Sequence, residues 1–233
     1  MPSFKQRSYQ KELLDSTDVP FADIKRNMQE LNIINEQLGG HKITLEGFKY
    51  FIQFIPSNET IHVVEIGAGG GDNLRVLKRW ANKKGLFLQL TGVDINAECI
   101  AFAEEQVENA GIDFICSDYR KVVFQHPPHI IFSSLFCHHF SDEELIVMLQ
   151  WLQQKSKRGF FINDLHRHPL AYYSIKWLTK LFSKSYLVKN DAPLSVQRSF
   201  VKKDWINLLK EAGIKHYTIQ WKWAFRWLIM ANK

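Results

Sequence analysis

A glycine-rich segment flanked by acidic residues is the part of the chain whose residue types best suit ligand binding. It spans residues 65–72 and reads EIGAGGGD, directly after an apolar run that predicts a strand. Glycines let the backbone turn sharply and let a ligand approach the main chain closely. The helix expected after them would offer free N–H groups to a carboxylate. The segment therefore predicts a ligand-binding turn between a strand and a helix.

Acidic residues distinguish among the three cofactor classes that use such a turn. A phosphate-binding P-loop needs a GK[ST] sequence after its glycines, and this turn has none. A dinucleotide fingerprint needs a third glycine at position 72, where Asp72 would repel a pyrophosphate. S-adenosylmethionine (SAM) has no phosphate and carries a sulfonium and an ammonium cation, which Glu65 and Asp72 favour. At the end of the next predicted strand, Asp94 can accept hydrogen bonds from both hydroxyls of a ribose, so the charges predict SAM as the cofactor.

Four segments resemble the motifs of class I SAM-dependent methyltransferases, in the order in which that family carries them. They are residues 64–71 (VEIGAGGG), 91–96 (TGVDIN), 114–119 (FICSDY) and 133–140 (SSLFCHHF). The last is similar to the small-molecule branch of the family, which includes the quinone-biosynthesis methyltransferases. The resemblance implies a Rossmann-like fold and cofactor contacts at Glu65, Gly67, Ala68, Gly69, Gly71, Asp94, Ile95, Ser117, Asp118, Tyr119 and Ser134.

Histidines that follow the fourth and fifth predicted strands are the candidates for a catalytic base. Open α/β sheets bind ligands at the carboxyl ends of their strands, and an imidazole can take a proton from a hydroxyl near neutral pH. We favour His139 as the base, with His138 beside it and His166 as the alternative. Asp164 could orient one of these rings, and Arg167 could hold an anionic substrate. The other interpretation is that these side chains only order their loops. No metal ion is expected, because the three cysteines lack metal-binding spacing and methyl transfer requires no metal.

The elements that position these residues alternate between strands and helices. Apolar runs predict strands at 61–66, 87–93, 113–116, 129–133 and 159–163, with helices between them and two further strands in the tail, 215–231. This alternation predicts an α/β fold, a mostly parallel seven-stranded sheet with helices on both faces and an antiparallel last strand. We expect residues 59–233 to form the SAM-binding domain. Residues 1–58 show helical periodicity and are expected to form a helical N-terminal cap or lid.

The segment at about 165–203 is expected to be an insertion that recognises the substrate. Within it, residues 170–189 read as one helix with a broad aromatic side and a lysine at every fourth position from Lys176 to Lys184. A basic amphipathic helix can cover an apolar pocket or make a peripheral contact with a membrane; the alternative is an ordinary surface helix. The alternating aromatic residues of the tail, 221–227, are expected to be buried against helices.

Composition and the narrower motifs restrict the function. The net charge is +6, and Lys and Arg are scattered until about residue 176, where they become denser, whereas nucleic-acid binders usually concentrate such charge on one face. No apolar run is long enough to span a bilayer. The N-terminus does not read as a secretory signal, so we expect a cytoplasmic protein. The Asn/Asp-Pro-Pro-Tyr/Phe signature of amino-group methylation does not follow the fourth strand, so no nucleic-acid partner is expected.

The substrate is expected to be an apolar aromatic small molecule. Residues 12–15, 35–41, 163–165 and 193–195 are similar to bacterial stand-alone methyltransferases associated with polyketide-type aromatic products. We therefore expect O-methylation of an aromatic or polyketide-like hydroxyl. The alternatives are C-methylation of a quinol-type ring and a non-catalytic SAM-binding module, and the oligomeric state stays open.

Overall fold

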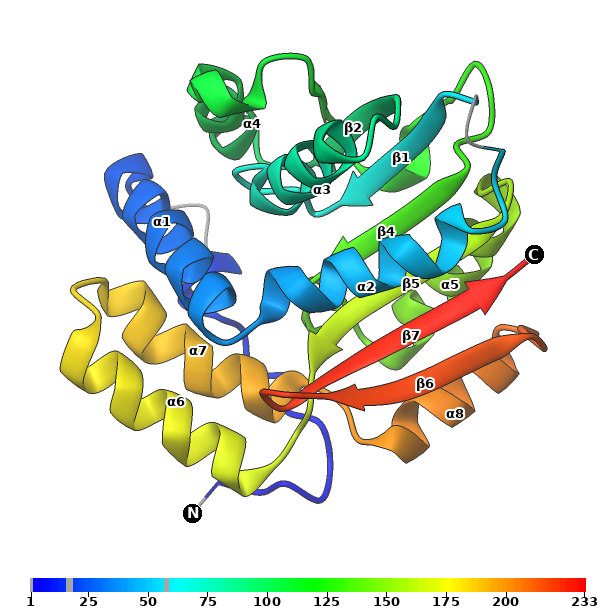
Figure 1. Ribbon diagram of the computed structural model, residues 1–233. Coiled ribbons are helices and arrows are strands. Elements are labelled where there is room, and N and C mark those ends of the chain that lie inside the picture. The colour runs from blue at the N-terminus through cyan, green and yellow to red at the C-terminus, as the bar shows by residue number, and fades with distance from the viewer. Residues whose placement is uncertain (1, 16–18, 57–58) are drawn as a thin grey trace.

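A seven-stranded sheet forms the centre of the computed structural model, which describes residues 2–15, 19–56 and 59–233 (Figure 1). The strands are β1 (Ile61–Ile66), β2 (Leu88–Asp94), β3 (Asp113–Cys116), β4 (Ile130–Ser134), β5 (Gly159–Leu165), β6 (Tyr217–Lys222) and β7 (Arg226–Asn232). Their order is β3-β2-β1-β4-β5-β7-β6. All pairings are parallel except those of β7, which runs antiparallel to both β5 and β6. The predicted fold class is confirmed. The expected domain boundary at residue 58 lies outside the described residues.

Helices cover both faces of the sheet (Figure 1). They are α1 (Phe21–Gln37), α2 (Gly40–Ile52), α3 (Asp72–Lys83), α4 (Ala97–Glu105), α5 (Asp142–Lys155), α6 (Pro169–Phe182), α7 (Tyr186–Arg198) and α8 (Lys202–Glu211). One face buries Phe48 and Phe51 of α2 and Leu74 of α3 against β1, β4 and β5. Outside this sandwich, α6, α7 and α1 lie together at the end where the parallel strands finish.

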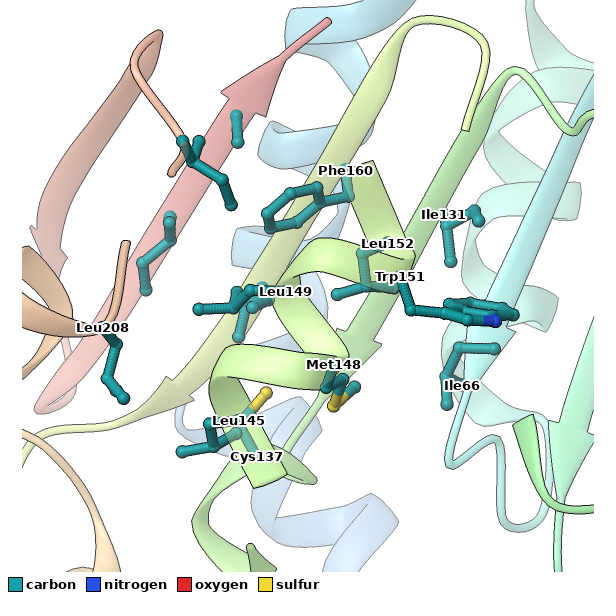
Figure 2. Close-up of a cluster of buried hydrophobic side chains, with 14 of the residues drawn as sticks. Ile66, Ile131, Cys137, Leu145, Met148, Leu149, Trp151, Leu152, Phe160 and Leu208 are labelled. Carbon is teal, nitrogen blue, oxygen red and sulfur yellow. The ribbon is translucent and has the colours of Figure 1, made fainter. Parts of the chain in front are cut away.

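The opposite face of the sheet holds the largest apolar cluster (Figure 2). Helix α5 directs Leu145, Leu149 and Leu152 toward Ile131 of β4 and Phe160 of β5, and all five side chains are inaccessible to solvent. The helix begins with a capping box in which the Ser141 hydroxyl and the Glu144 carboxylate satisfy each other's backbone N–H groups. This packing fixes the loop between β4 and α5, which carries the paired histidines.

The segment after β5 departs from prediction. Residues 170–189 were expected to form one helix, but α6 ends at Phe182 and α7 begins at Tyr186. The backbone N–H of Ser185 donates to the Glu30 carboxylate of α1 (3.1 Å), and the Ser185 hydroxyl accepts from Val188 N–H (3.3 Å). This tertiary contact and this cap end one helix and start another within a sequence whose periodicity continues.

Two of the tail aromatics also depart from prediction. Trp227 of β7 is buried, but Trp221 is 46% exposed and Trp223 is 70% exposed. Strand β6 is the edge of the sheet, and only its Tyr217 and Ile219 pack against the apolar cluster under α8. Among the described residues, no helix is both long enough and apolar enough to cross a membrane.

Candidate active site

The turn after β1 has the tight geometry that its glycines predict. Gly67 has a φ of 73°, in the left-handed region that side chains disfavour. A Cβ atom added there would lie 2.4 Å from the ring of Phe136, and one at Gly71 would lie 2.8 Å from the ring of Phe114. The turn therefore requires glycine at both positions and exposes main-chain groups at the carboxyl edge of β1.

Glu65 places a buried carboxylate beneath this turn. Its Oε1 accepts a hydrogen bond from the side-chain amide of Asn73 (2.8 Å), whereas Oε2 has no hydrogen-bond partner among the described residues. Burial, reinforced by the nearby Asp72 carboxylate, raises the pKa of Glu65 well above its usual range. Asn73 also contacts His41 of α2, with 3.0 Å between its Oδ1 and the ring Nδ1. A carboxylate with a free oxygen fits a cationic ligand, and the network ties the N-terminal helices to the turn.

Asp94 links the turn to the end of β2. Its Oδ2 accepts from the backbone N–H of Gly69 (2.9 Å) and its Oδ1 accepts from that of Asn96 (3.0 Å). Burial raises the pKa of Asp94, and these two hydrogen bonds oppose the shift. The cap of α4 is Asn96, whose side chain accepts from the first turn, so Asp94 is not needed as the cap. Its carboxylate is held rigidly at the wall of a cavity.

That cavity, about 150 Å³ in volume, is the candidate cofactor cavity. Its wall is made by Ile66, Gly67, Val93, Asp94, Ile95, Ser117, Asp118, Tyr119, Arg120, Phe136 and Phe140. Six residues predicted as cofactor contacts thus meet from the ends of β1, β2 and β3. Asp118 is ion-paired with Arg120 (2.5 Å), and the hydrogen bond from Arg120 lowers the pKa of Asp118.

Other predicted contacts lie around this cavity without lining it. The methyl group of Ala68 is buried in the apolar cluster under α2 and α3, so Ala68 can offer a ligand only its main chain. The hydroxyl of Ser134 accepts from the Asn163 amide (3.3 Å). The roles of Gly69, Gly71 and Ser134 toward the cofactor stay predictions.

A second cavity of about 300 Å³ is the candidate substrate cavity. Its wall is mostly apolar, and α1, α6 and α7 contribute Leu31, Ile34, Ile175, Leu178 and Val196 among others. The polar residues that line it include Glu12, Asn27, His138, His139, Asp191 and Arg226. An apolar chamber with a few polar groups is typical of small-molecule sites.

His138 and Asp164 form a buried pair at this cavity. The carboxylate Oδ1 lies 2.8 Å from Nδ1 of His138, so the ring donates to Asp164 through Nδ1. Burial disfavours the charge on Asp164, but the His138 ring and the backbone N–H of Leu165 outweigh burial, and the pKa of Asp164 lies below its usual value. The predicted orienting role of Asp164 matches this geometry.

Glu12 completes the group and was not predicted as a catalytic residue. Its Oε1 lies 3.8 Å from Nε2 of His138, and its Oε2 lies 3.9 Å from Nε2 of His139. Burial raises the pKa of Glu12, against the opposing effects of His139, a hydrogen bond from Ser195 and the Arg198 guanidinium. We call Glu12, His138, His139 and Asp164 the histidine–carboxylate cluster. The only sequence signal for Glu12 was its place in the narrower resemblance.

The cluster is better suited to moving protons than to holding a metal ion. Ligand atoms of Glu12, His138 and His139 lie within 4.8 Å of one another, a spacing that a divalent ion could bridge after small shifts. However, the Arg198 Nε lies 3.7 Å from Glu12 Oε1 and already supplies a positive charge there. A second cation would be repelled by it.

His166 and Arg167 do not join the cluster. His166 is not among the described residues that line the substrate cavity, and its Nδ1 accepts from the Trp221 indole (3.2 Å). Burial, with the neighbouring His168 and Arg167, lowers the pKa of His166 to about 4. Arg167 donates to the backbone carbonyl of Phe4 (3.1 Å) and to Asp204 (2.9 Å), which fixes the chain around β5.

Comparisons with known proteins agree with this geometry. Residues 63–159 match a family model described as a methyltransferase domain, and no curated protein matches the chain. The plantazolicin methyltransferase BpumL, solved with S-adenosylhomocysteine, is 19% identical with a TM-score of 0.66, covering 90% of each chain. A SAM-dependent methyltransferase from Aquifex aeolicus is 16% identical with a TM-score of 0.60, covering 92% of this chain and 99% of its own.

A third similar structure is that of an enzyme named for magnesium protoporphyrin IX. The magnesium protoporphyrin IX methyltransferase of Synechocystis PCC 6803, solved with bound SAM, is 12% identical with a TM-score of 0.56. The alignment covers 85% of this chain and 82% of that one. The residues that match the methyltransferase domain include most of β1 and all of β2, β3 and β4, so they contain the glycine turn, Asp94 and Asp118. The similar structures share the fold around this domain. Residues 63–159 thus match a methyltransferase domain, and this match together with the shared fold supports a class I SAM-dependent methyltransferase that uses SAM as its cofactor.

Proposed function

We propose that this methyltransferase transfers a methyl group to a hydroxyl of an apolar aromatic small molecule. The observation that carries the proposal is the substrate cavity, whose apolar wall also contains Glu12, His138 and His139 of the histidine–carboxylate cluster. The similar structures include complexes with desmethyl-plantazolicin analogues and an enzyme named for magnesium protoporphyrin IX, which supports a small-molecule substrate. A polyketide-like phenol suits the aliphatic wall and the basic group together.

The cofactor supplies an electrophilic methyl group when it is bound. The free oxygen of Glu65 and the carboxylate of Asp94 are the groups that we assign to its cationic and ribose parts. Both carboxylates are already oriented by hydrogen bonds, so little reorganisation is required on binding. Phe136 lines the cofactor cavity and Leu135 lines the substrate cavity, so this loop contributes to both cavities.

His139 is our choice for the base that accepts the substrate proton. Its side chain is 23% exposed and lines the substrate cavity, whereas that of His138 is only 3% exposed. Glu12 lies near Nε2 of both rings and can stabilise the protonated imidazole. Asp164 holds the His138 ring through its contact with Nδ1. The His139 ring lies beside the His138 ring, with 4.4 Å between the ring centroids.

Arg226 indicates a second polar group on the proposed substrate. This buried guanidinium donates through Nη2 to Asn35 (2.7 Å), while its Nε and Nη1 have no partner among the described residues. Burial lowers the pKa of Arg226 to about 10, which still leaves it charged at neutral pH. Because Arg226 lines the substrate cavity, we propose that the substrate also carries a carbonyl or carboxylate oxygen.

The described helices support the roles that we propose for the N-terminal residues 1–58 as a lid and for residues 165–203 as the substrate-recognition insertion. Helix α1 lines the substrate cavity, and His41 of α2 contacts Asn73 at the start of α3, which supports the proposal that the N-terminal segment is a lid. Helices α6 and α7, within the expected insertion at 165–203, supply further apolar residues of the wall. Cytoplasmic localisation stays a prediction.

The test is methyl transfer from isotopically labelled SAM to a panel of alkyl-substituted phenols, resorcinols and hydroxybenzoic acids. We expect an O-methyl product, identified by the carbon chemical shift of the labelled methyl group. A methyl group on a ring carbon would establish the alternative, C-methylation of a quinol-type ring, for which the same base would serve. Absence of transfer to every hydroxylated aromatic, with SAM bound normally, would contradict the proposed substrate class.

A further inference from the structure

The outward side of α6 carries large apolar side chains that the fold does not bury. Leu170, Tyr173, Trp177, Leu181 and Phe182 are between 44% and 78% exposed, and the first four recur at three- and four-residue steps along one side of the helix. We call these five residues the α6 outer face. Contiguous exposed apolar patches on a soluble fold mark interaction sites.

The opposite side of α6 packs against the rest of the protein. Ala171 and Tyr172 are buried and belong to a small apolar cluster with Val196 of α7. Ala171, Ile175 and Leu178 line the substrate cavity. The α6 outer face is therefore an addition to the helix, because the cavity and the core require only its inward side.

Positive charge surrounds the α6 outer face. Lys176 and Lys180 lie in α6, Lys184 follows it and Lys189 lies in the first turn of α7, and the sequence has no Asp or Glu from residue 165 to 190. The ammonium groups of Lys176 and Lys180 lie over the rings of Tyr172 and Trp177, each 5.6 Å from the ring centroid. The lysine stems thus lie along the aromatic residues, and their charged ends stay beside the apolar side chains.

We infer that the α6 outer face docks on a bilayer surface that contains anionic lipids. Aromatic and aliphatic side chains would enter the boundary between headgroups and acyl chains while the lysines meet the lipid phosphates and carboxylates. A second copy of the chain fits this face poorly, since a two-fold contact of α6 with α6 would bring the lysines of both copies together. The inference does not depend on the proposed reaction.

Docking in this orientation has a consequence for the substrate cavity. Ile175 and Leu178 of the same helix form part of the cavity wall. A membrane-bound α6 would therefore hold the cavity within one helix diameter, about 10 Å, of the lipid surface. If the proposed function is correct, an apolar substrate could enter from the membrane without crossing water.

The test is flotation of the full chain with vesicles of phosphatidylcholine, with or without 30% phosphatidylglycerol. We expect binding to the anionic vesicles, with a blue shift of tryptophan emission, and weak binding to pure phosphatidylcholine. Trp177→Ser combined with Phe182→Ser should abolish flotation. Lys176→Gln combined with Lys180→Gln should weaken it about 30-fold, the effect of two surface lysines.

Matched controls distinguish docking through α6 from nonspecific binding by any exposed aromatic residue or lysine pair. Phe87→Ser removes an exposed phenylalanine before β2, and Lys83→Gln with Lys84→Gln removes the same charge from the end of α3. Both controls should float like the parent, and every variant should keep its SAM affinity. Equal flotation of the α6 and control variants, or no flotation at all, overturns the inference. A dimer that Trp177→Ser dissociates in analytical ultracentrifugation would assign the face to a second copy instead.

Discussion

His138 and Asp164 are joined by a 2.8 Å contact between Nδ1 and Oδ1, and both side chains are almost completely buried. A buried carboxylate favours a proton on the imidazole nitrogen that faces it. The other nitrogen of His138, Nε2, lies 3.8 Å from Glu12, which in turn lies beside His139. Asp164 therefore acts on the cluster through His138, although Asp164 itself does not line the substrate cavity.

Asp164→Asn should lower turnover by about 10² or more while leaving SAM affinity unchanged. The amide would donate to Nδ1 of His138 and move its proton to Nε2, toward Glu12. The measurements are turnover against pH and SAM binding by calorimetry. The acidic limb of the pH–rate profile should move to lower pH, because a charge that stabilises protonated imidazole is lost. An unchanged profile would show that Asp164 serves only the fold.

His139→Gln should reduce turnover by about 10² to 10⁴, the usual contribution of a general base, again without loss of SAM affinity. His166→Gln is the matched control, since His166 lies outside the substrate cavity and hydrogen-bonds to Trp221. Steady-state kinetics with the best phenolic substrate separate the two variants. A larger loss in His166→Gln than in His139→Gln would reverse our assignment of the base.

The sequence predicted the sheet and the cofactor side of the site better than the substrate side. Glu65, Asp94 and Asp118 sit at the ends of strands, where apolar periodicity and glycine chemistry fix both position and exposure. Glu12 is held near the histidines by contacts with α7, such as the hydrogen bond from Ser195, more than a hundred positions away in the chain. Such a long-range contact leaves no local pattern. The break between α6 and α7 was missed for the same reason, since Glu30 of α1 binds the backbone there.

Asp94→Ala should weaken SAM binding at least about tenfold, or about 1.4 kcal/mol, which is the scale of a hydrogen bond to a charged group. The variant also loses the acceptor for Gly69 N–H, so the glycine turn itself should become less rigid. Calorimetric titration with SAM measures the loss, and Asp118→Ala is the comparison. Asp118 is engaged by Arg120, so its removal should have the smaller effect. Wild-type affinity in Asp94→Ala would contradict the ribose assignment.

Glu65→Gln should stabilise the protein without ligand and weaken its binding of SAM. The pKa of Glu65 is raised well above 4.5 by burial, so the folded state holds a proton that the unfolded state releases. Folding stability therefore falls as pH rises above 4.5 toward the pKa of the folded state, and glutamine removes this loss.

Thermal unfolding between pH 5 and pH 8 measures the effect, and the parent should lose more stability over this range than the variant. Addition of SAM should reduce the difference between parent and variant in the stability lost over this pH range, because a bound cation favours the ionised carboxylate. For the same reason, SAM affinity should rise with pH in the parent only. Asp113→Asn, on the edge strand β3 with an exposed side chain, is the control and should leave both slopes unchanged. Identical pH dependence of SAM affinity in Glu65→Gln and the parent would mean that this carboxylate does not face the cationic part of the cofactor.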